Sequence, residues 1–413
     1  MANNNENKIL NVPNLRFPEF SGEWKKCTLG DITINFNLRN KEKIELPMYS
    51  VTNNRGFIPQ SEQFEDRDMV GEDIKAYKII HNKDFAYNPA RINVGSIAKY
   101  NGSKPCMISS LYVCFKATDG IDEDWLMHLL RSPKIQYYYN INGEGGVRIY
   151  LFYPNFARIR TSFPTIAEQR KIANLLSLLD ARITTQNKII EDLKKLKSAI
   201  IDKTFCYPNE SSPQKRFIGF TEEWHLVHLS DICQRVRTKN FNTQCTLVLT
   251  IAAQFGLVSQ EEFFNKSVAS DNLEGYYLLR KGDFAYNKSY SGDYAWGAVK
   301  RLEYFSEGVL SPLYICFRPD TARIDSDFLA HYFESKKWYK GIADIAGEGA
   351  RNHGLLNLSV IDYFKTLHRI PSIQEQKVIA NVLNKLTSKM SIEKNLYDDL
   401  LLQRQHLLQQ MFI

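Results

Sequence analysis

Two stretches of the chain repeat their apolar residues at the three- and four-residue spacing of one face of a long helix. The first carries Leu176, Leu179, Ile183, Ile190, Leu193 and Ile200, and the second carries Ile379, Leu383, Leu386, Met390, Tyr397, Leu400 and Leu407. This spacing predicts a coiled coil, in which occasional polar residues on the contact line fix the register at some cost in stability. The polar residues on that line are Gln186, Lys197, Glu393 and Arg404.

Each stretch opens with the pattern Pro-x-Ile-x-Glu-Gln-x-x-Ile-Ala-Asn, at residues 164–174 and again at 371–381. In both, a hydroxyl residue precedes the glutamate by three positions, which is the spacing of a capping box at a helix start. We therefore expect helices over 165–206 and 372–413. At about 40 residues they would be roughly 60 Å long. A small domain is narrower than this, which favours pairing of the helices over two amphipathic helices that each lie on a separate domain.

The remainder of the chain contains two copies of one sequence unit. Five short sequences recur in the same order: 16–24 as 216–224, 84–88 as 283–287, 111–115 as 313–317, 124–128 as 327–331, and 143–145 as 347–349. In each copy, short β-branched and aromatic runs separated by Gly, Asn and Pro predict strands. A helix is expected near 124–131, with its counterpart near 327–336.

The expected fold class is α+β, with two similar mixed α/β domains joined by two long antiparallel coiled-coil helices and an internal two-fold repeat. We assign 1–15 to a flexible N-terminal arm, 16–164 to the first domain, 165–206 to the central helix, 207–371 to a linker and the second domain, and 372–413 to the C-terminal helix. If the helices pair antiparallel, they hold the two domains at opposite ends of a rod.

Composition narrows the class of protein without identifying a partner. A hydrophobic content of 44% supports real cores, and no apolar run approaches the length that spans a bilayer. Seven cysteines without a Cys-x-x-Cys pair suit reduced thiols, so we expect a cytoplasmic protein without a membrane partner. The net charge is +7, but residues 216–371 hold 18 basic and 18 acidic side chains, whereas 85–118 hold four basic and no acidic ones. Charge alone does not establish nucleic-acid binding.

Motifs for catalysis are largely missing from the sequence. It has neither the Asn/Asp-Pro-Pro-Tyr/Phe turn of adenine methyltransferases nor a Gly-x-x-x-x-Gly-Lys phosphate loop. His225 and His228 have no accompanying ligand cluster, and we expect no metal and no cofactor. Pro319-Asp320 with Glu334-Ser335-Lys336 resembles a nuclease signature, but its Glu-x-Lys falls in a segment that is predicted to be helical rather than a strand.

Candidate contacts to base edges follow the recurring Asp-Phe-Ala-Tyr-Asn sequence, because Arg and Lys can bond guanine and Asn can bond adenine. They are Arg91, Asn93, Lys99, Asn101 and Lys104 in the first copy and Lys288, Ser289, Tyr290, Lys300 and Arg301 in the second. Arg148 and Arg351 follow Gly-rich turns that are either simply tight or able to approach a phosphate closely. The two segments agree at their borders and differ inside. This predicts that each copy reads a different sequence, with ordinary drift of surface loops as the alternative.

The repeated helix start, the Arg-Phe-x-x-Phe-x-x-x-Trp openings and the two variable domains resemble the specificity subunit of type I restriction-modification systems, over about residues 14–413. The resemblance implies a non-catalytic subunit in which each domain recognises one half of a split site in double-stranded DNA and the helices set the spacing. It also implies two methyltransferase subunits and motor-nuclease subunits as partners. On this basis we expect Glu168, Gln169, Glu375 and Gln376, at the helix starts, to contact partners.

Two other functions remain open from the sequence. The chain could be the targeting part of a self-contained restriction enzyme, or a nuclease, in which case the purified protein would show Mg²⁺-dependent or S-adenosylmethionine-dependent activity. It could also be a coiled-coil adaptor with two peptide-binding heads, in which case its binding would not depend on DNA or on salt.

Overall fold

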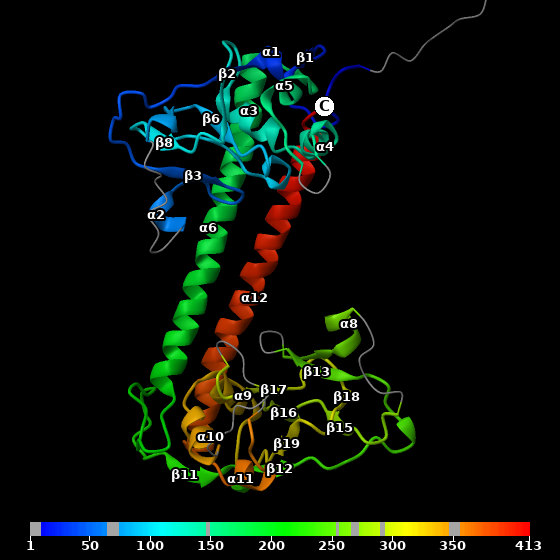
Figure 1. The fold of residues 1–413 in the computed structure, drawn as a ribbon. Coiled ribbons are helices and arrows are strands. Elements are labelled where there is room, and N and C mark those ends of the chain that lie inside the picture. Colours follow the sequence, from blue (N-terminus) through cyan, green and yellow to red (C-terminus); the bar gives the residue numbers. More distant parts are fainter. Residues whose placement is uncertain are drawn as a thin grey trace, which may run out of the picture. The chain divides into compact units, whose positions relative to one another are not determined.

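The computed structural model describes residues 10–63, 74–145, 149–252, 256–265, 272–289, 294–346 and 356–413. It forms two compact units, one made of Met1–Asn187 with Asn395–Ile413 (unit 1) and the other of Lys188–Lys394 (unit 2). There are two long helices, α6 (Ile166–Thr204) and α12 (Ile373–Gln410), among the described residues (Figure 1). Each helix is divided between the two units, so that one part belongs to unit 1 and the other to unit 2. Each unit is therefore completed by segments that are far apart in the sequence.

Unit 1 is built on a four-stranded antiparallel sheet in the order β2 (Thr33–Phe36), β9 (Val113–Ala117), β6 (Phe85–Tyr87) and β7 (Ile97–Lys99). Three two-stranded antiparallel ribbons accompany it: β1 (Lys25–Thr28) with β10 (Arg160–Phe163), β3 (Tyr49–Thr52) with β4 (Gly56–Pro59), and β5 (Lys78–Ile80) with β8 (Cys106–Ile108). Its shorter helices are α1 (Leu29–Ile32), α2 (Gln60–Gln63), α3 (Glu123–Leu130), α4 (Pro133–Asn142) and α5 (Tyr153–Ala157), and its 3-10 turns are η1 (Ile74–Ala76) and η2 (Ile92–Val94).

The short helices of unit 1 begin where local sequence signals place them. The side chain of Asp122 accepts hydrogen bonds from the amides of Asp124 and Trp125 at the start of α3, which is how an N-cap satisfies amides that have no partner within the helix. Ser132 caps α4 in the same way, and Pro133 occupies the first turn, where its missing N–H costs nothing. The short helix expected in this copy is thereby confirmed.

The main core of unit 1 joins its sheet to the ends of both long helices. Trp125 of α3 is fully buried, and its ring centroid lies 6.0 Å from that of Phe412 near the C-terminus. Leu176 of α6 and Leu408 of α12 belong to the same apolar cluster. The C-terminal end of α12 thus packs beside the N-terminal part of α6 within this unit.

Unit 2 repeats the arrangement with a four-stranded sheet in the order β12 (Cys233–Arg235), β19 (Ile315–Pro319), β16 (Phe284–Asn287) and β17 (Ala298–Arg301). Its antiparallel ribbons are β11 (His225–His228) with β20 (Leu367–Ile370), β13 (Leu249–Ala252) with β14 (Gly256–Ser259), and β15 (Tyr277–Arg280) with β18 (Glu307–Leu310). Its shorter helices are α7 (Leu229–Ile232), α8 (Gln260–Phe264), α9 (Ser326–Glu334), α10 (Tyr339–Ile345) and α11 (Val360–Phe364), with the 3-10 turn η3 (Phe241–Thr243). Here Ile201 of α6 shares a core with Ile379 and Leu383 of α12.

Strand register shows that the two scaffolds are copies of one another. Phe85 pairs with Lys99 on one side and Phe115 on the other. Phe284 pairs in the same way with Arg301 and Phe317. The expected α+β fold, with two similar mixed domains and two long helices, is confirmed.

The apolar residues of the contact line expected along the long helices are buried or half-buried. Leu176 and Leu179 in α6 and Leu383 and Leu400 in α12 are all at most 9% exposed. Within unit 1, the polar interruption Arg404 bonds Asp180 of α6. A polar residue on this line therefore makes a specific bond that only one register allows, which agrees with its expected role.

Among the described residues, no helix is both long and apolar enough to cross a membrane. Cys114 and Cys316 are buried in β9 and β19, as expected for core residues. Burial raises the pKa of both thiols to about 12, so neither thiol is reactive.

Candidate nucleic-acid interface

Arg91 has the surroundings expected of a residue that binds DNA. It is exposed, follows β6 and caps the 3-10 turn η2. Its side chain makes no hydrogen bond or ion pair with any residue in the described ranges. It borders a depression of about 480 Å³, the Arg91 hollow, which is also lined by β3 and by Asn53, Asn54 and Arg55. Among the described residues, the lining holds two arginines and no carboxylate, which suits an anionic ligand.

A second depression of about 480 Å³ also borders the β3–β4 ribbon and shares Tyr49, Asn54 and Arg55 with the first. This Lys99 hollow is lined by Lys99, Asn101, Arg131, Asp124 and Asp180 among others, so basic and acidic side chains are mixed. The structure thus brings two predicted residues together here and places Arg91 in the neighbouring hollow. Both hollows border Asn54 and Arg55, which sequence reasoning did not select.

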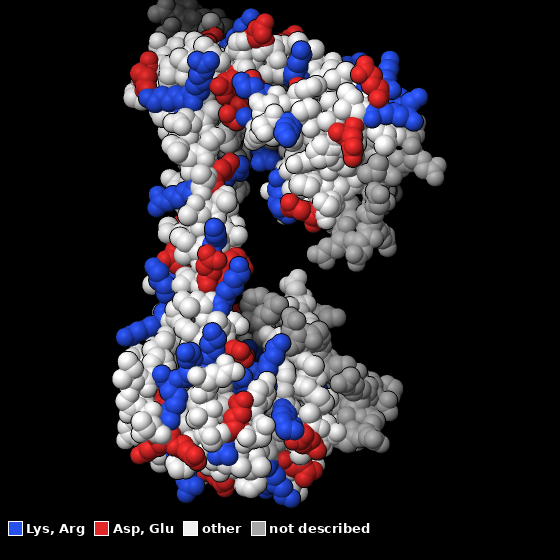
Figure 2. Space-filling model, turned by 90° about the vertical axis from the view of Figure 1, so that its left-hand side faces the viewer, with Lys and Arg blue, Asp and Glu red and all other residues white. Residues whose placement is uncertain are grey.

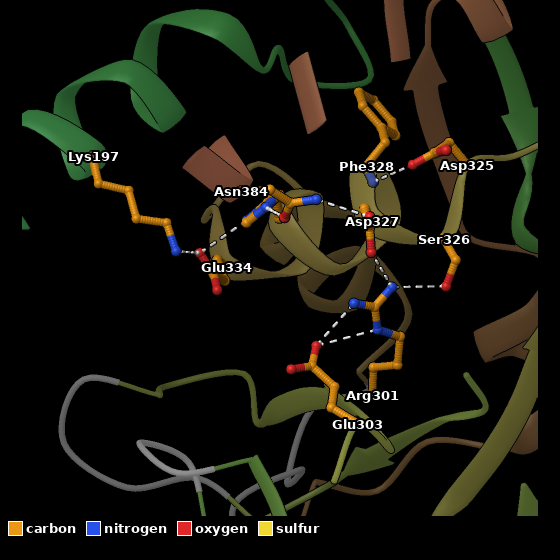
Figure 3. Close-up of polar contacts among 10 residues, drawn as sticks. Lys197, Arg301, Glu303, Asp325, Ser326, Asp327, Phe328, Glu334 and Asn384 are labelled. Carbon is orange, nitrogen blue, oxygen red and sulfur yellow. Dashed lines mark hydrogen bonds and ion pairs between the residues drawn. The ribbon is translucent and has the colours of Figure 1, made fainter. Parts of the chain in front are cut away.

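Lys99 and Arg301 occupy equivalent positions and make equivalent ion pairs. Lys99, at the end of β7, bonds Asp124 in the first turn of α3. Arg301, at the end of β17, bonds Asp327 in the first turn of α9 at 2.6 Å and also bonds Ser326 and Glu303 (Figure 3). Residues that read two different sequences should differ between the copies, whereas Lys99 and Arg301 each form an ion pair with the equivalent aspartate of the neighbouring helix. Both side chains hold a helix against the sheet, and we assign them a structural role.

Asp327 and Glu334 of α9 extend this network toward the long helices. Asn384 of α12 donates to Asp327 at 2.8 Å, and Lys197 of α6 lies 2.8 Å from Glu334 (Figure 3). Burial alone would raise the pKa of Asp327, but the hydrogen bonds from Arg301 and Asn384 outweigh it and lower that pKa. For Glu334, burial is likewise outweighed by His331 and Lys197, and the pKa falls to about 2. Both carboxylates are committed to holding α9 in place.

Lys300 is less available than its sequence position suggested. It borders a depression of about 210 Å³ together with Trp338, Tyr339 and Glu334. Burial lowers the pKa of its ammonium group, since water is kept from the charge. Lys300 is half-buried, so its amine is less accessible to a duplex than an exposed lysine would be.

The other predicted contacts are exposed, internally bonded or outside the described residues. Asn101, Lys104 and Ser289 are exposed and Lys288 is half-buried, while the amide of Asn93 bonds Asn140 at 3.2 Å. Arg148, Tyr290 and Arg351 lie outside the described residues. Glu144 and Tyr150, which are both described, exchange two backbone hydrogen bonds of 2.8 Å.

The glutamate at the start of each long helix is bonded inside its own unit. Arg16 donates two hydrogen bonds to Glu168, at 2.8 and 2.7 Å, and Arg216 donates two to Glu375, at 3.0 and 2.6 Å. The expected capping box is therefore only half formed in the first copy. The hydroxyl of Thr165 accepts from the amide of Glu168 at 3.4 Å, but the glutamate carboxylate binds the arginine instead.

The glutamine that follows each of these glutamates joins the helix start to the neighbouring short helix. The side chain of Gln169 accepts from the amide of Asp122, and that of Gln376 from the amide of Asp325, which caps α9.

The same two pairs, Glu168 with Gln169 and Glu375 with Gln376, were expected to contact partner subunits. All four residues are at most 1% exposed, so their side chains present no surface to a partner. We correct that expectation: the repeated Glu-Gln sequence joins each helix to its domain. The sequence does carry a signal for this role: arginine recurs at 16 and 216, and glutamate recurs at 168 and 375.

The histidines and the nuclease-like residues have structural surroundings. His128 and His331 are buried and bond Ser177 and Asn384 on the long helices. Glu334 lies on a helix, as expected, and is paired with Lys197. Among the described residues, no group of His, Cys, Asp and Glu could hold a metal ion.

Basic and acidic side chains are mixed on the face of the molecule that Figure 2 shows, where they are interspersed over both units. The charge balance of residues 216–371 agrees with this. A broad electrostatic field from this face is therefore not expected to drive recognition.

No protein-family model matches the chain. Two curated proteins of Methanocaldococcus jannaschii are similar to it in sequence. One is described as a type I restriction enzyme specificity subunit, MjaX, and is 25% identical over 237 residues, which cover 54% of this chain and 56% of that protein. The other, the type I restriction enzyme MjaVIII specificity subunit, is 24% identical over 259 residues, or 58% of each protein. The chain thus matches less than two thirds of the length of either relative.

Among solved structures, the S subunit of a type I restriction-modification system from M. genitalium aligns with 97% of this chain and 99% of its own. The TM-score is 0.57 and the identity 15%, so this likeness shows the fold. The chain is therefore a relative of the specificity subunits of type I restriction enzymes, in sequence over part of its length and in fold over nearly all of it, which confirms the resemblance seen in its repeated helix start.

Proposed function

We propose that the chain is the sequence-specific DNA-binding subunit of a type I restriction-modification complex. Each recognition domain reads one half of a bipartite, asymmetric site, and the long helices set the distance between the halves. The chain performs no chemistry itself. It directs two methyltransferase subunits and, for cleavage, motor-nuclease subunits to the site.

The observation that carries this proposal is the pairing of identical scaffolds with unlike loops. Phe85 and Phe284 have the same strand partners in the two sheets, and the same ion pair ties α3 and α9 to them. The segments that follow, 89–104 and 288–301, share almost no sequence. A preserved frame with changed loop side chains is what reading two different half-sites requires.

Residues of the described surface support a division of labour with partner proteins. The carboxylates of the nuclease-like pattern are paired with cations, and no metal-binding group is found among the described residues. A subunit that supplies sequence selectivity needs base-edge donors and acceptors, and the amide and guanidinium groups that line the Arg91 hollow are of that kind.

The test is a map of methylated adenines in the host with and without the gene. We expect a split motif, with defined bases on either side of an undefined spacer, that disappears when the gene is deleted. A methylation pattern that does not change on deletion would refute the proposal. Methyl transfer or Mg²⁺-dependent cleavage by the purified chain alone would favour an enzyme.

A further inference from the structure

The turn of the β3–β4 ribbon presents three polar residues: Asn53, Asn54 and Arg55. Thr52 pairs with Gly56 across the ribbon, which leaves a three-residue turn, and Gly56 has the positive φ of 67° that such turns often require. The hydroxyl of Thr52 accepts from the amide of Arg55 and donates to the carbonyl of Gly56, both at 3.1 Å. The turn is thus held by Thr52 and the backbone, so the three side chains are not needed to hold it.

The surroundings of the turn make the ribbon a ridge. The Arg91 hollow lies along β3 and the Lys99 hollow lies at the start of β4, and each has a volume of about 480 Å³. Asn54 and Arg55 are exposed and border both hollows. Side chains at the tip therefore stand between two depressions on the surface of unit 1.

Such a ridge matches the shape of a duplex. The major groove is about 12 Å wide and admits a two-stranded β-ribbon, while the backbone that borders the groove needs space beside the ribbon. The Arg91 hollow has that space together with two arginines, and none of the described residues that line it is a carboxylate. The mixed charges of the Lys99 hollow make it the poorer site for a phosphate.

The chemistry of the tip matches base edges. Asparagine pairs with adenine through two hydrogen bonds, and arginine pairs with guanine in the same way. The side chains of Asn53 and Asn54 make no hydrogen bond with any residue in the described part of the chain. Nearby, Oε1 of Gln60 is buried in the hollow and accepts no hydrogen bond from the described residues.

We propose that the β3–β4 ribbon enters the major groove of the half-site read by unit 1, with Asn53, Asn54 and Arg55 reading base edges and the adjoining backbone lying in the Arg91 hollow. This inference rests on the proposed function and names the residues that determine specificity in one domain. Base reading then depends on the tip, and Arg91 contributes mainly to positioning the backbone.

The ion pair of Arg55 does not prevent this role. Arg55 bonds Glu62 at 2.6 Å, but the two side chains are 62% and 50% exposed. An ion pair this exposed contributes little to stability, because water and salt screen it. Arg55 can therefore exchange this carboxylate for a guanine edge.

The second copy supplies a matched variant. Its β13–β14 ribbon pairs Ala252 with Gly256, the same register as Thr52 with Gly56. In sequence, its turn is Ala253-Gln254-Phe255, which lies outside the described residues. Asn53→Ala, Asn54→Gln and Arg55→Phe together transfer this turn to unit 1 without altering either strand.

The experiment replaces the chromosomal gene with this triple variant and maps methylated adenines. We expect methylation at the original sites to fall about tenfold or more, the size of one lost base contact, through altered preference in one half of the motif with the other half unchanged. Arg158→Ala, at an exposed arginine that follows α5 as its C-cap and lines neither hollow, is the control and should leave the motif intact. Asn54→Ala is a milder variant, and it should relax the same half of the motif.

The outcomes separate this inference from the proposed function. If the parent gene yields no split motif, the proposed function fails. If the parent motif exists and both tip variants retain it in full, the ribbon does not read bases and only this inference fails. Equal weakening of every sequence in a folded variant would assign the tip to phosphate contact and would also overturn it.

Discussion

Replacement of Glu168 by alanine tests whether the repeated Glu-Gln sequence holds each long helix on its domain. The carboxylate of Glu168 is 1% exposed and accepts two hydrogen bonds from Arg16 and one of 3.2 Å from Nε1 of Trp24. Removal of one partner of a buried ion pair costs about 3 to 5 kcal/mol. Arg16 is 16% exposed and keeps part of its hydration, so we expect a loss near the lower end of that range.

The second copy provides an internal comparison. Glu375 accepts the same two bonds from Arg216, but Nε1 of Trp224 has no hydrogen-bond partner among the described residues. Glu168→Ala leaves the buried N–H of Trp24 unpaired as well, and this penalty is about 1 to 3 kcal/mol. Glu168→Ala should therefore lower the free energy of unfolding by about 1 kcal/mol or more beyond the loss caused by Glu375→Ala.

Calorimetry with hydrogen exchange measures this difference unit by unit. For units of this size, 1 kcal/mol shifts the melting temperature by about 2 to 4 °C. A loss of about 3 kcal/mol from the ion pair and about 1 kcal/mol from Trp24 should therefore lower the melting temperature of Glu168→Ala by roughly 8 to 16 °C. Exchange should rise first around residues 16–24, which pack on the helix start. Glu191→Gln, at an exposed glutamate of the same helix, is the control and should change nothing. If Glu168→Ala left the stability unchanged and weakened partner binding, the structural role would be refuted. Glu168 would then be assigned to a contact with a partner subunit.

Three further changes test other parts of the structure. Arg91→Ala should weaken binding to the correct DNA by about 1 to 3 kcal/mol and reduce its salt dependence, as measured by titration of the complex at several salt concentrations; an unchanged salt slope would exclude a phosphate contact. Arg301→Ala should lower the melting temperature of unit 2 and leave the methylated motif intact, because Arg301 bonds Asp327 rather than solvent; a changed motif would show that it reads bases. Burial lowers the pKa of His368 to about 3, so the unfolded chain takes up a proton below about pH 6.5 that the folded one does not, and stability should fall as pH decreases toward 3, by about 1.4 kcal/mol per pH unit. His368→Gln should flatten that part of the stability profile, and an equal slope in the variant would assign it to other groups.

The sequence indicates the candidate site only in part. It points to Arg91, because the residue type and the variable segment are visible in the chain; the structure leaves Arg91 exposed, and its contact with DNA stays a prediction. The sequence also points to Lys99 and Arg301, which are ion-paired. Residue type cannot distinguish a free cation from a paired one, since the partner carboxylates lie 25 and 26 positions away. The β3–β4 turn was missed, although alignment of the two copies across Gly56 and Gly256 would have exposed its different residues.

The sequence by itself determined the duplication, the two long helices and their buried contact line. These features are local or periodic, because apolar spacing, helix caps and repeated sequences each indicate the structure of the segment that contains them. Only the tertiary structure decided which polar residues stay available. The buried glutamates at the helix starts form ion pairs with arginines more than 150 positions away. Asn54, in contrast, is exposed and borders two hollows. Burial and pairing depend on which distant segments meet, and no local pattern in the chain carries that information.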